Sequence, residues 1–211
     1  MKSFLSAPIV CLITRGDTTA DNFEHNKTEI IKLVDLAVDL GVSMIQIREK
    51  RLSAGLLLSL VRDAARLTAG TGTKLLVNDR ADIAVAGNAD GVHLTTVSPP
   101  VGKIRDRFGE DLIIGVSAHS SEAVGKARLG GADFAVYGPV FMTPGKAEPV
   151  GLDRVVAVCT AHEPFPVLAL GGIDSENYRA ALDAGAAGFA AIRSLNNADS
   201  LRKIMNEIRS L

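Results

Sequence analysis

The segment Gln46-Ile47-Arg48-Glu49-Lys50 carries the side chains with the most evident chemistry in this sequence. It ends an apolar run that favours an extended chain, in which side chains point alternately to two faces. Gln46, Arg48 and Lys50 therefore share one strongly cationic face. Such a face suits a ligand with several phosphate oxygens, because Arg and Lys bind phosphate through charge-assisted hydrogen bonds. The competing interpretation is a strand end whose charges are simply solvated.

A second apolar run ends in Asn78-Asp79-Arg80. One interpretation is a turn or a helix N-cap, which Asn and Asp often form. The other is a metal site, because Mg²⁺ prefers carboxylate oxygens and an adjacent amide can bind a phosphate that the metal also contacts. On this second interpretation Asp79 is the metal ligand and Asn78 binds the phosphate.

Polar side chains also follow later apolar runs. Ser117 and His119 are a hydroxyl and an imidazole at alternating positions, although a single histidine is as often structural as catalytic. Gly172 and Arg193 come after two further runs, where loops can bind a phosphate through backbone N–H groups. The intervening residues 138–146 are rich in Gly and Pro, include Lys146, and read as a mobile lid.

Short apolar runs alternate with longer amphipathic stretches along the whole chain, which indicates repeated βα units around a parallel sheet. Eight such units in about 200 residues favour a single-domain (β/α)8 TIM barrel over residues 1–211, with an open doubly wound sheet as the alternative. In such a barrel the active site lies at the carboxyl ends of the strands, where all of these polar groups fall. The predicted strands are residues 9–14, 44–48, 74–78, 91–94, 112–117, 134–137, 167–170 and 189–192.

The composition agrees with a globular enzyme. The 211 residues are 47% hydrophobic, and a net charge of −1 argues against nucleic-acid binding or an anionic membrane surface. We expect a cytoplasmic protein, because no signal peptide and no membrane-spanning run is visible. A leucine-rich helix face at residues 56–60 suggests a homodimer.

The cations converging with Asp79 on one rim suit small-molecule substrates that carry a diphosphate and a second phosphate.

These residues resemble a known family, thiamine phosphate synthase, and its relative thiazole tautomerase, which shares the barrel. The resemblance implies a Mg²⁺-assisted transfer in which an aminopyrimidine-methyl diphosphate loses pyrophosphate and the nitrogen of thiazole phosphate captures the pyrimidine-methyl cation. The motifs that carry the resemblance are residues 46–50, Asn78-Asp79-Arg80, Asp90-Gly91-Val92-His93-Leu94, residues 114–119, Gly138-Pro139-Val140-Phe141 with Lys146, and Gly171-Gly172-Ile173.

The resemblance also implies roles for individual residues. Asp79 would hold the metal, and Arg48, Ser117, Lys146 and His119 would be the catalytic side chains. The pyrimidine diphosphate would be bound by Gln46, Arg48, Lys50, Asn78, Ser117 and Lys146, and the thiazole phosphate by Thr143, Gly172 and Ile192, with Arg193 beside them.

Three positions depart from the synthase pattern. Ser98 replaces a second metal-binding Asp, Gly145 replaces a Thr, and Arg193 replaces a Ser, although an Arg can itself bind phosphate. These departures leave two alternatives open. One is a thiazole tautomerase with His119 as general acid and base, and the other is a non-catalytic barrel that binds thiamine precursors.

Overall fold

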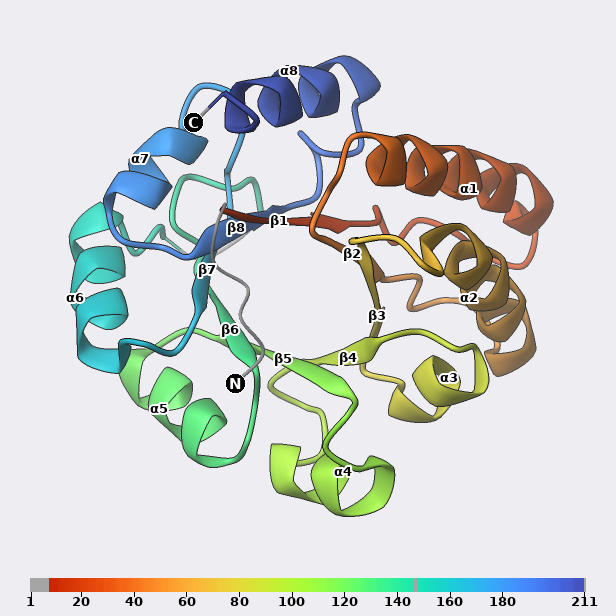
Figure 1. Ribbon diagram of the computed structural model, residues 1–211, viewed down its shortest axis with the longest axis horizontal. Helices are drawn as coiled ribbons and strands as arrows, with labels where there is room; N and C mark the ends of the chain where they lie inside the picture. The colour runs from red at the N-terminus through yellow and green to blue at the C-terminus, as the bar shows by residue number, and fades with distance from the viewer. Residues whose placement is uncertain (1–7, 146–147, 211) are drawn as a thin grey trace.

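Eight parallel strands close into a barrel in the computed structural model, which describes residues 8–145 and 148–210 (Figure 1). Consecutive strands pair, and β8 pairs with β1, so the sheet has no open edge. The predicted (β/α)8 barrel is confirmed, and the open doubly wound sheet is excluded. The strands are β1 (Ile9–Ile13), β2 (Met44–Ile47), β3 (Lys74–Asn78), β4 (Gly91–Leu94), β5 (Ile113–Ala118), β6 (Phe134–Tyr137), β7 (Val167–Leu170) and β8 (Gly188–Ala191).

A helix follows each strand, and together these helices form a ring around the barrel (Figure 1). This order allows each parallel strand to start again at the same end of the barrel. The helices are α1 (Phe23–Asp39), α2 (Ala54–Thr68), α3 (Ala81–Ala86), α4 (Val101–Phe108), α5 (Ser121–Leu129), α6 (Leu152–His162), α7 (Tyr178–Asp183) and α8 (Ala198–Ile208).

The strands are buried on both faces, which explains their continuous apolar sequences. In β1, Ile9, Cys11 and Ile13 pack in the cluster that fills the barrel. Val10 and Leu12 belong instead to the larger cluster between the strands and the helices. The period of two along a strand therefore divides the apolar side chains between an inner core and an outer core.

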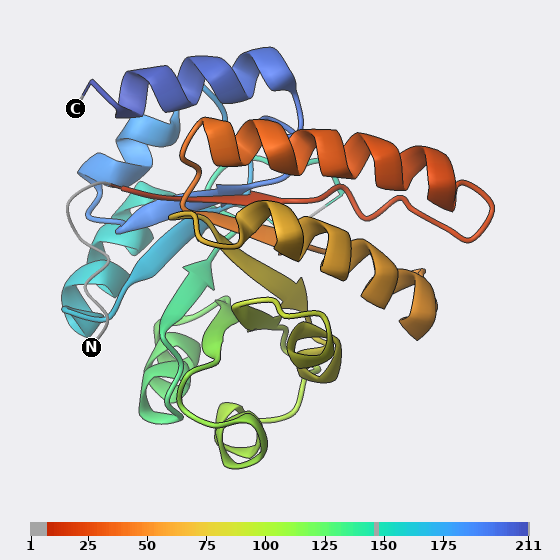
Figure 2. The same ribbon diagram turned by 45° about the vertical axis from the view of Figure 1, so that its right-hand side comes forward.

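Helix α2 carries the leucine-rich face at residues 56–60. The helix begins after Ser53, whose hydroxyl accepts a hydrogen bond from the Leu56 backbone N–H. Leu57 and Leu60 are buried in the outer core, and α2 lies beside α1 (Figure 2). Much of the apolar surface that suggested a homodimer is thus covered within the chain itself.

Strands β1 and β2 each end one residue earlier than predicted, at Ile13 and Ile47. The reason is local, because the Arg48 backbone N–H donates to the Thr14 side-chain hydroxyl at 2.8 Å instead of to a backbone carbonyl. Two other strands are displaced by one residue from the prediction, with β5 covering Ile113–Ala118 and β8 covering Gly188–Ala191. None of these shifts moves a candidate residue away from the carboxyl end of its strand.

Candidate active site

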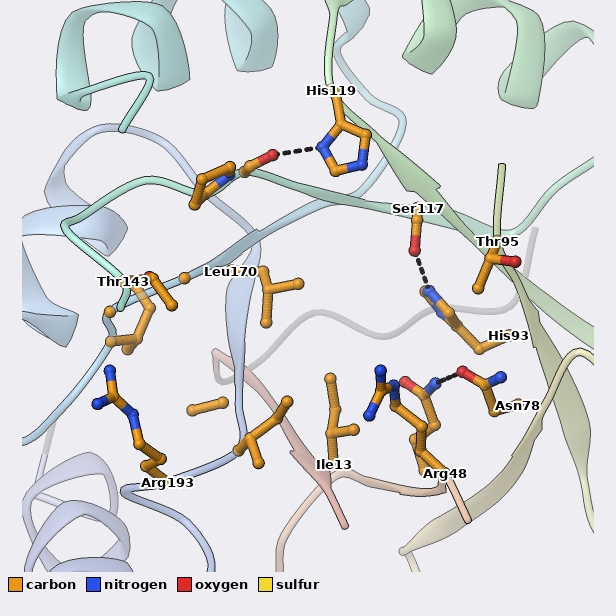
Figure 3. Close-up of a pocket in the computed structure, with 18 of the residues that line it drawn as sticks. Ile13, Arg48, Asn78, His93, Thr95, Ser117, His119, Thr143, Leu170 and Arg193 are labelled. Atoms are coloured by element: carbon orange, nitrogen blue, oxygen red, sulfur yellow. Dashed lines mark hydrogen bonds between the residues drawn. The ribbon is translucent and has the colours of Figure 1, made fainter. Parts of the chain in front are cut away.

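A cavity of about 520 Å³ opens at the carboxyl ends of the strands (Figure 3). Its wall brings together residues from all eight strands or the loops that follow them, as the barrel requires. Asp79 is not on this wall, and Lys146 lies outside the residues that the structure describes. The predicted residues that do line it are Gln46, Arg48, Lys50, Asn78, Ser117, His119, Thr143, Gly172, Ile192 and Arg193.

The polar groups of the cavity form two separate ends. Figure 3 shows Arg48 and Asn78 on one side and Thr143 and Arg193 on the other. Apolar side chains, including Leu170, lie between the two ends. The cavity therefore offers two positively charged regions joined by an apolar middle, which is the shape needed to bind two phosphorylated ring compounds side by side.

A chain of hydrogen bonds organises the Arg48 end. The Gln46 side-chain amide donates to Asn78 Oδ1 at 2.9 Å, and the Asn78 amide donates to Asp79 Oδ2 at 2.6 Å. Gln46 is 2% exposed, and within the described residues its Oε1 is buried without a hydrogen-bond partner. An unpaired buried acceptor costs free energy, and a ligand that donates an N–H could offset this cost if the Gln46 side chain moved to expose the oxygen.

Asp79 lies just behind this wall with φ of +61°, a left-handed conformation that Asp and Asn tolerate better than most residues. Its Oδ1 accepts from the Thr95 backbone N–H at 3.1 Å, from the Thr95 hydroxyl at 2.8 Å and from the Ser98 hydroxyl. Partial burial raises the pKa of Asp79, but these hydrogen bonds and the nearby Lys50 ammonium outweigh it, so the pKa lies below its usual value. Asp79 is therefore an anion at neutral pH.

The surroundings of Asp79 fit a metal held through one carboxylate oxygen. Three donors occupy Oδ1, whereas among the described residues Oδ2 accepts only from the Asn78 amide and retains a lone pair. No group of three or more His, Cys, Asp or Glu side chains that could hold a metal occurs among the described residues. Mg²⁺ is commonly bound through one or two carboxylates together with substrate phosphates and water, and that arrangement remains open to Asp79.

His93 belongs to the cavity wall, although only its motif, and no role for it, was predicted. It lies in β4, is 3% exposed, and its Nε2 shares a hydrogen bond of 2.9 Å with the Ser117 hydroxyl. Burial lowers the pKa of His93 to about 4, against a smaller opposing effect of Asp79, so the imidazole is neutral at pH 7. In the sequence, His93 stands out only as a polar residue inside an apolar run, whereas the predicted site residues follow the ends of such runs.

The low pKa of His93 predicts a pH-dependent stability. Between pH 6.5 and about 4 the unfolded chain binds a proton at this residue and the folded chain does not, so the free energy of unfolding falls as the pH falls. The expected contribution is about 3 kcal/mol over this range. Denaturant unfolding at several pH values should show that the free energy of unfolding falls less on acidification for His93→Gln than for the parent protein. Parallel pH curves for the two proteins would contradict the prediction.

His119 is oriented by the loop after β6. Its Nδ1 donates to the Gly138 carbonyl oxygen at 2.6 Å, which leaves Nε2 for the cavity side (Figure 3). In the neutral imidazole Nε2 is then a hydrogen-bond acceptor and a possible base. The structure thus gives His119 a defined tautomer.

The opposite end of the cavity is built from the loops after β6, β7 and β8. Gly172 has φ of +65°, and a Cβ there would lie 2.6 Å from the Met142 carbonyl oxygen and 2.8 Å from the Phe141 Cβ. Glycine is therefore required for contact with the β6–α6 loop, in addition to any approach of a phosphate. Thr143 and Arg193 lie near each other at this end (Figure 3).

The part of the chain that the structure describes includes no helix with the length and apolar character needed to span a membrane.

A family model described as thiamine monophosphate synthase matches residues 11–195. Among sequence relatives, a protein of Geobacter sulfurreducens is 44% identical over 83% of this chain and 83% of its own length. A thiamine-phosphate synthase of Chlorobium luteolum is 36% identical over 97% of this chain and 96% of its own length.

A solved structure gives the same result. Thiamine phosphate pyrophosphorylase from Pyrococcus furiosus superimposes with a TM-score of 0.82 at 29% identity, and the match covers 96% of this chain and 94% of that one. The family model spans most of the barrel, and the match to the Chlorobium luteolum synthase covers 96% of that protein. The chain therefore belongs to the thiamine monophosphate synthase family.

Proposed function

We propose that the protein is a transferase that joins 4-amino-2-methyl-5-(diphosphooxymethyl)pyrimidine to thiazole phosphate and releases pyrophosphate. The observation that carries this proposal is the single cavity with two cationic ends and an apolar middle. A diphosphate fits one end, a phosphate fits the other, and the two rings meet between them. Family membership and the synthases of similar length support the same activity.

The diphosphate belongs at the end formed by Arg48, Lys50 and Asn78. The bond between the pyrimidine methylene carbon and the diphosphate oxygen breaks, and the negative charge moves onto the leaving group. Fixed cations stabilise that charge more in the transition state than in the substrate, which is the condition for catalysis. Lys146, predicted from the sequence, is assigned to the same phosphate groups.

The pyrimidine ring belongs beside Gln46 and Ser117. Gln46 lines the cavity, and a shift of its side chain would let the buried Oε1, which has no hydrogen-bond partner among the described residues, accept from the exocyclic amine of the ring. The neutral His93 holds the Ser117 hydroxyl in position without adding a positive charge next to the pyrimidine-methyl cation. Adding such a charge would oppose the formation of the cation.

The thiazole phosphate belongs at the end formed by Thr143, Gly172, Ile192 and Arg193. There it directs the thiazole nitrogen toward the methylene carbon, so that the C–N bond forms by capture of the pyrimidine-methyl cation after pyrophosphate has left. Arg193 compensates in part for the hydroxyl donor that is missing at Gly145, because a guanidinium can hold two phosphate oxygens at once.

Asp79 is the proposed protein ligand of Mg²⁺. When bound, Mg²⁺ supplies charge neutralisation to the diphosphate. Asp79 would contribute one oxygen, and the Asn78 amide, which donates to that same carboxylate, would keep the carboxylate oriented. Since the described residues include no group of three or more His, Cys, Asp or Glu side chains that could hold a metal, substrate phosphates and water would supply the remaining ligands.

The direct test is to supply purified protein with both substrates and to measure pyrophosphate release and thiamine phosphate formation. The assay is run with Mg²⁺ and with a chelator. Product formed only with Mg²⁺ supports the synthase and its metal requirement. Product formed equally with chelator keeps the synthase and removes Asp79 from the metal role. No product under either condition contradicts the proposal.

Ser98 offers a test of the metal site that does not depend on turnover. Ser98→Asp would place a second carboxylate beside Asp79, and we expect the affinity of the free protein for Mn²⁺ to rise about tenfold or more. The fraction of free Mn²⁺ is measured by electron paramagnetic resonance without substrates. Ser98→Asn is the matched control, since it has nearly the same shape without the charge. Equal Mn²⁺ affinity in all three proteins would contradict Asp79 as a ligand.

The orientation of His119 favours a second candidate, thiazole tautomerase, in which its Nε2 would move the ring proton. If this is the activity, His119→Ala should lower the rate of tautomerisation by about 10²–10⁴-fold. If the protein is the synthase, the same variant should change thiamine phosphate formation only modestly. Measuring both reactions with parent and variant separates the two candidates. An unchanged tautomerisation rate would remove His119 from that chemistry.

A further inference from the structure

The Arg48 side chain on the cavity wall contacts the loop between β1 and α1. The Arg48 backbone N–H donates to the Thr14 hydroxyl, and its guanidinium packs against Gly16. Gly16 has φ of +80°, and a Cβ there would lie 2.8 Å from Arg48 Nη1 and 2.8 Å from the Arg48 carbonyl oxygen. The loop between β1 and α1 therefore forms one wall against which the Arg48 side chain lies. Movement of this loop would move the guanidinium.

Glu49 holds that loop in place. Its side chain points away from the cavity, as strand alternation predicts, and the residue is 2% exposed. Glu49 Oε1 accepts from the Thr14 hydroxyl at 2.6 Å and from the Gly16 backbone N–H at 3.1 Å, and Oε2 accepts from the Thr18 backbone N–H at 3.0 Å. Three protein donors from the loop after β1 thus fix the orientation of this buried carboxylate.

Thr14 connects Glu49 to Arg48. Because the Thr14 hydroxyl gives its hydrogen to Glu49, the oxygen presents a lone pair to the Arg48 backbone N–H at 2.8 Å. Glu49 thus fixes two groups that contact Arg48, namely the Thr14 hydroxyl and Gly16. Glu49 itself is not on the cavity wall, so any effect on a ligand there must pass through these neighbours.

We infer that Glu49 is a positioning residue for Arg48, and that through Thr14 and Gly16 it holds the guanidinium ready for a diphosphate. This inference rests on the proposed function, since it names the group that prepares the diphosphate end of the cavity. By its charge alone, a buried carboxylate directly behind a cationic site is unfavourable for binding an anion. Its role here is to order the loop that orients the cation, which reduces the cost of ordering when the ligand binds.

The test uses inorganic pyrophosphate as the probe and measures its affinity by isothermal titration calorimetry. In Glu49→Gln, one carboxylate oxygen becomes an NH₂ group that faces a donor, so at least one of the three hydrogen bonds is lost. We expect the affinity for pyrophosphate to fall roughly tenfold. In steady-state assays the KM for the pyrimidine diphosphate should rise more than kcat falls, and the KM for thiazole phosphate should stay unchanged.

A double-mutant cycle separates positioning from general destabilisation. If Glu49 acts through Arg48, Glu49→Gln should have little further effect on pyrophosphate affinity once Arg48 is alanine. An equal loss of affinity in both backgrounds would overturn the inference. So would a lower unfolding temperature with unchanged pyrophosphate affinity, because that result describes a purely structural carboxylate. Glu29→Gln, which removes an exposed carboxylate from the adjacent α1, is the control for charge alone.

Thr14 supplies a second route if Glu49→Gln does not fold. Thr14→Val removes the connecting hydroxyl at nearly constant shape, and it should also weaken pyrophosphate binding. Thr14→Ser restores the hydroxyl and should restore the affinity. Equal affinity in the valine and serine variants would overturn the inference. Absence of pyrophosphate binding by the parent protein would instead contradict the proposed function, so the two failures are distinguishable.

Discussion

Replacing Arg48 with alanine is expected to lower kcat for pyrophosphate release by roughly 10²–10³-fold. The guanidinium lies on the cavity wall at the diphosphate end, where negative charge develops as the C–O bond breaks. Its loss removes stabilisation that is greatest in the transition state, so kcat falls and not only the affinity for substrate. The measurement is steady-state release of pyrophosphate with both substrates saturating.

The matched control for this variant is Arg51→Ala. Arg51 is exposed, lies three residues further along the same segment, and is not on the cavity wall. The Arg51→Ala variant should keep nearly the full rate of pyrophosphate release. Thermal unfolding of both variants establishes that each is folded. A rate for Arg48→Ala close to that of the parent protein would remove the end of β2 from the diphosphate site.

Replacing Asp79 with asparagine is expected to abolish the stimulation by Mg²⁺, with a loss of about 10²-fold in kcat/KM at saturating metal. Asparagine tolerates the left-handed φ of +61° at this position, so the backbone should be preserved. Its neutral amide removes the anionic oxygen and sets an N–H against the Asn78 amide that now donates to Asp79. The activity is measured as a function of Mg²⁺ concentration.

Asp82→Asn is the matched control for the Asp79 variant. Asp82 is exposed at the start of α3 and pairs with Arg80, so it changes the same net charge close by without touching the cavity. Its Mg²⁺ dependence should equal that of the parent protein. If Asp79→Asn also kept the parent's Mg²⁺ dependence, the metal would have to be held by substrate phosphates and water alone.

Ser98 departs from the family pattern, and its hydroxyl takes a structural role beside Asp79. The sequence shows a hydroxyl where a second carboxylate is expected, which predicts a weaker metal site. The hydroxyl donates to Asp79 together with Thr95, so this side of the carboxylate is closed by protein donors. A hydroxyl there also avoids placing two carboxylates side by side, which costs free energy when no metal is bound.

The sequence by itself determined the barrel and the composition of most of the cavity wall. Strands buried on both faces need continuous apolar runs, and residues such as Gln46, Arg48 and Lys50 share a face because the period of a strand is two. Because every parallel strand ends at the same side of the barrel, polar groups far apart in sequence could be assigned to one site. Errors of one residue at strand ends did not disturb this assignment.

Only the tertiary structure decided how those residues are held. His93 sits within a strand, and its partner Ser117 comes from the next strand, so no local spacing in the sequence predicted their contact. Asp79 proved to be withdrawn behind the wall, and Glu49, which strand alternation turned away from the site, proved to organise the loop beside Arg48. Periodicity determines which face a side chain takes, whereas hydrogen bonds between distant segments depend on strand register and loop paths that the barrel sets only once it has closed.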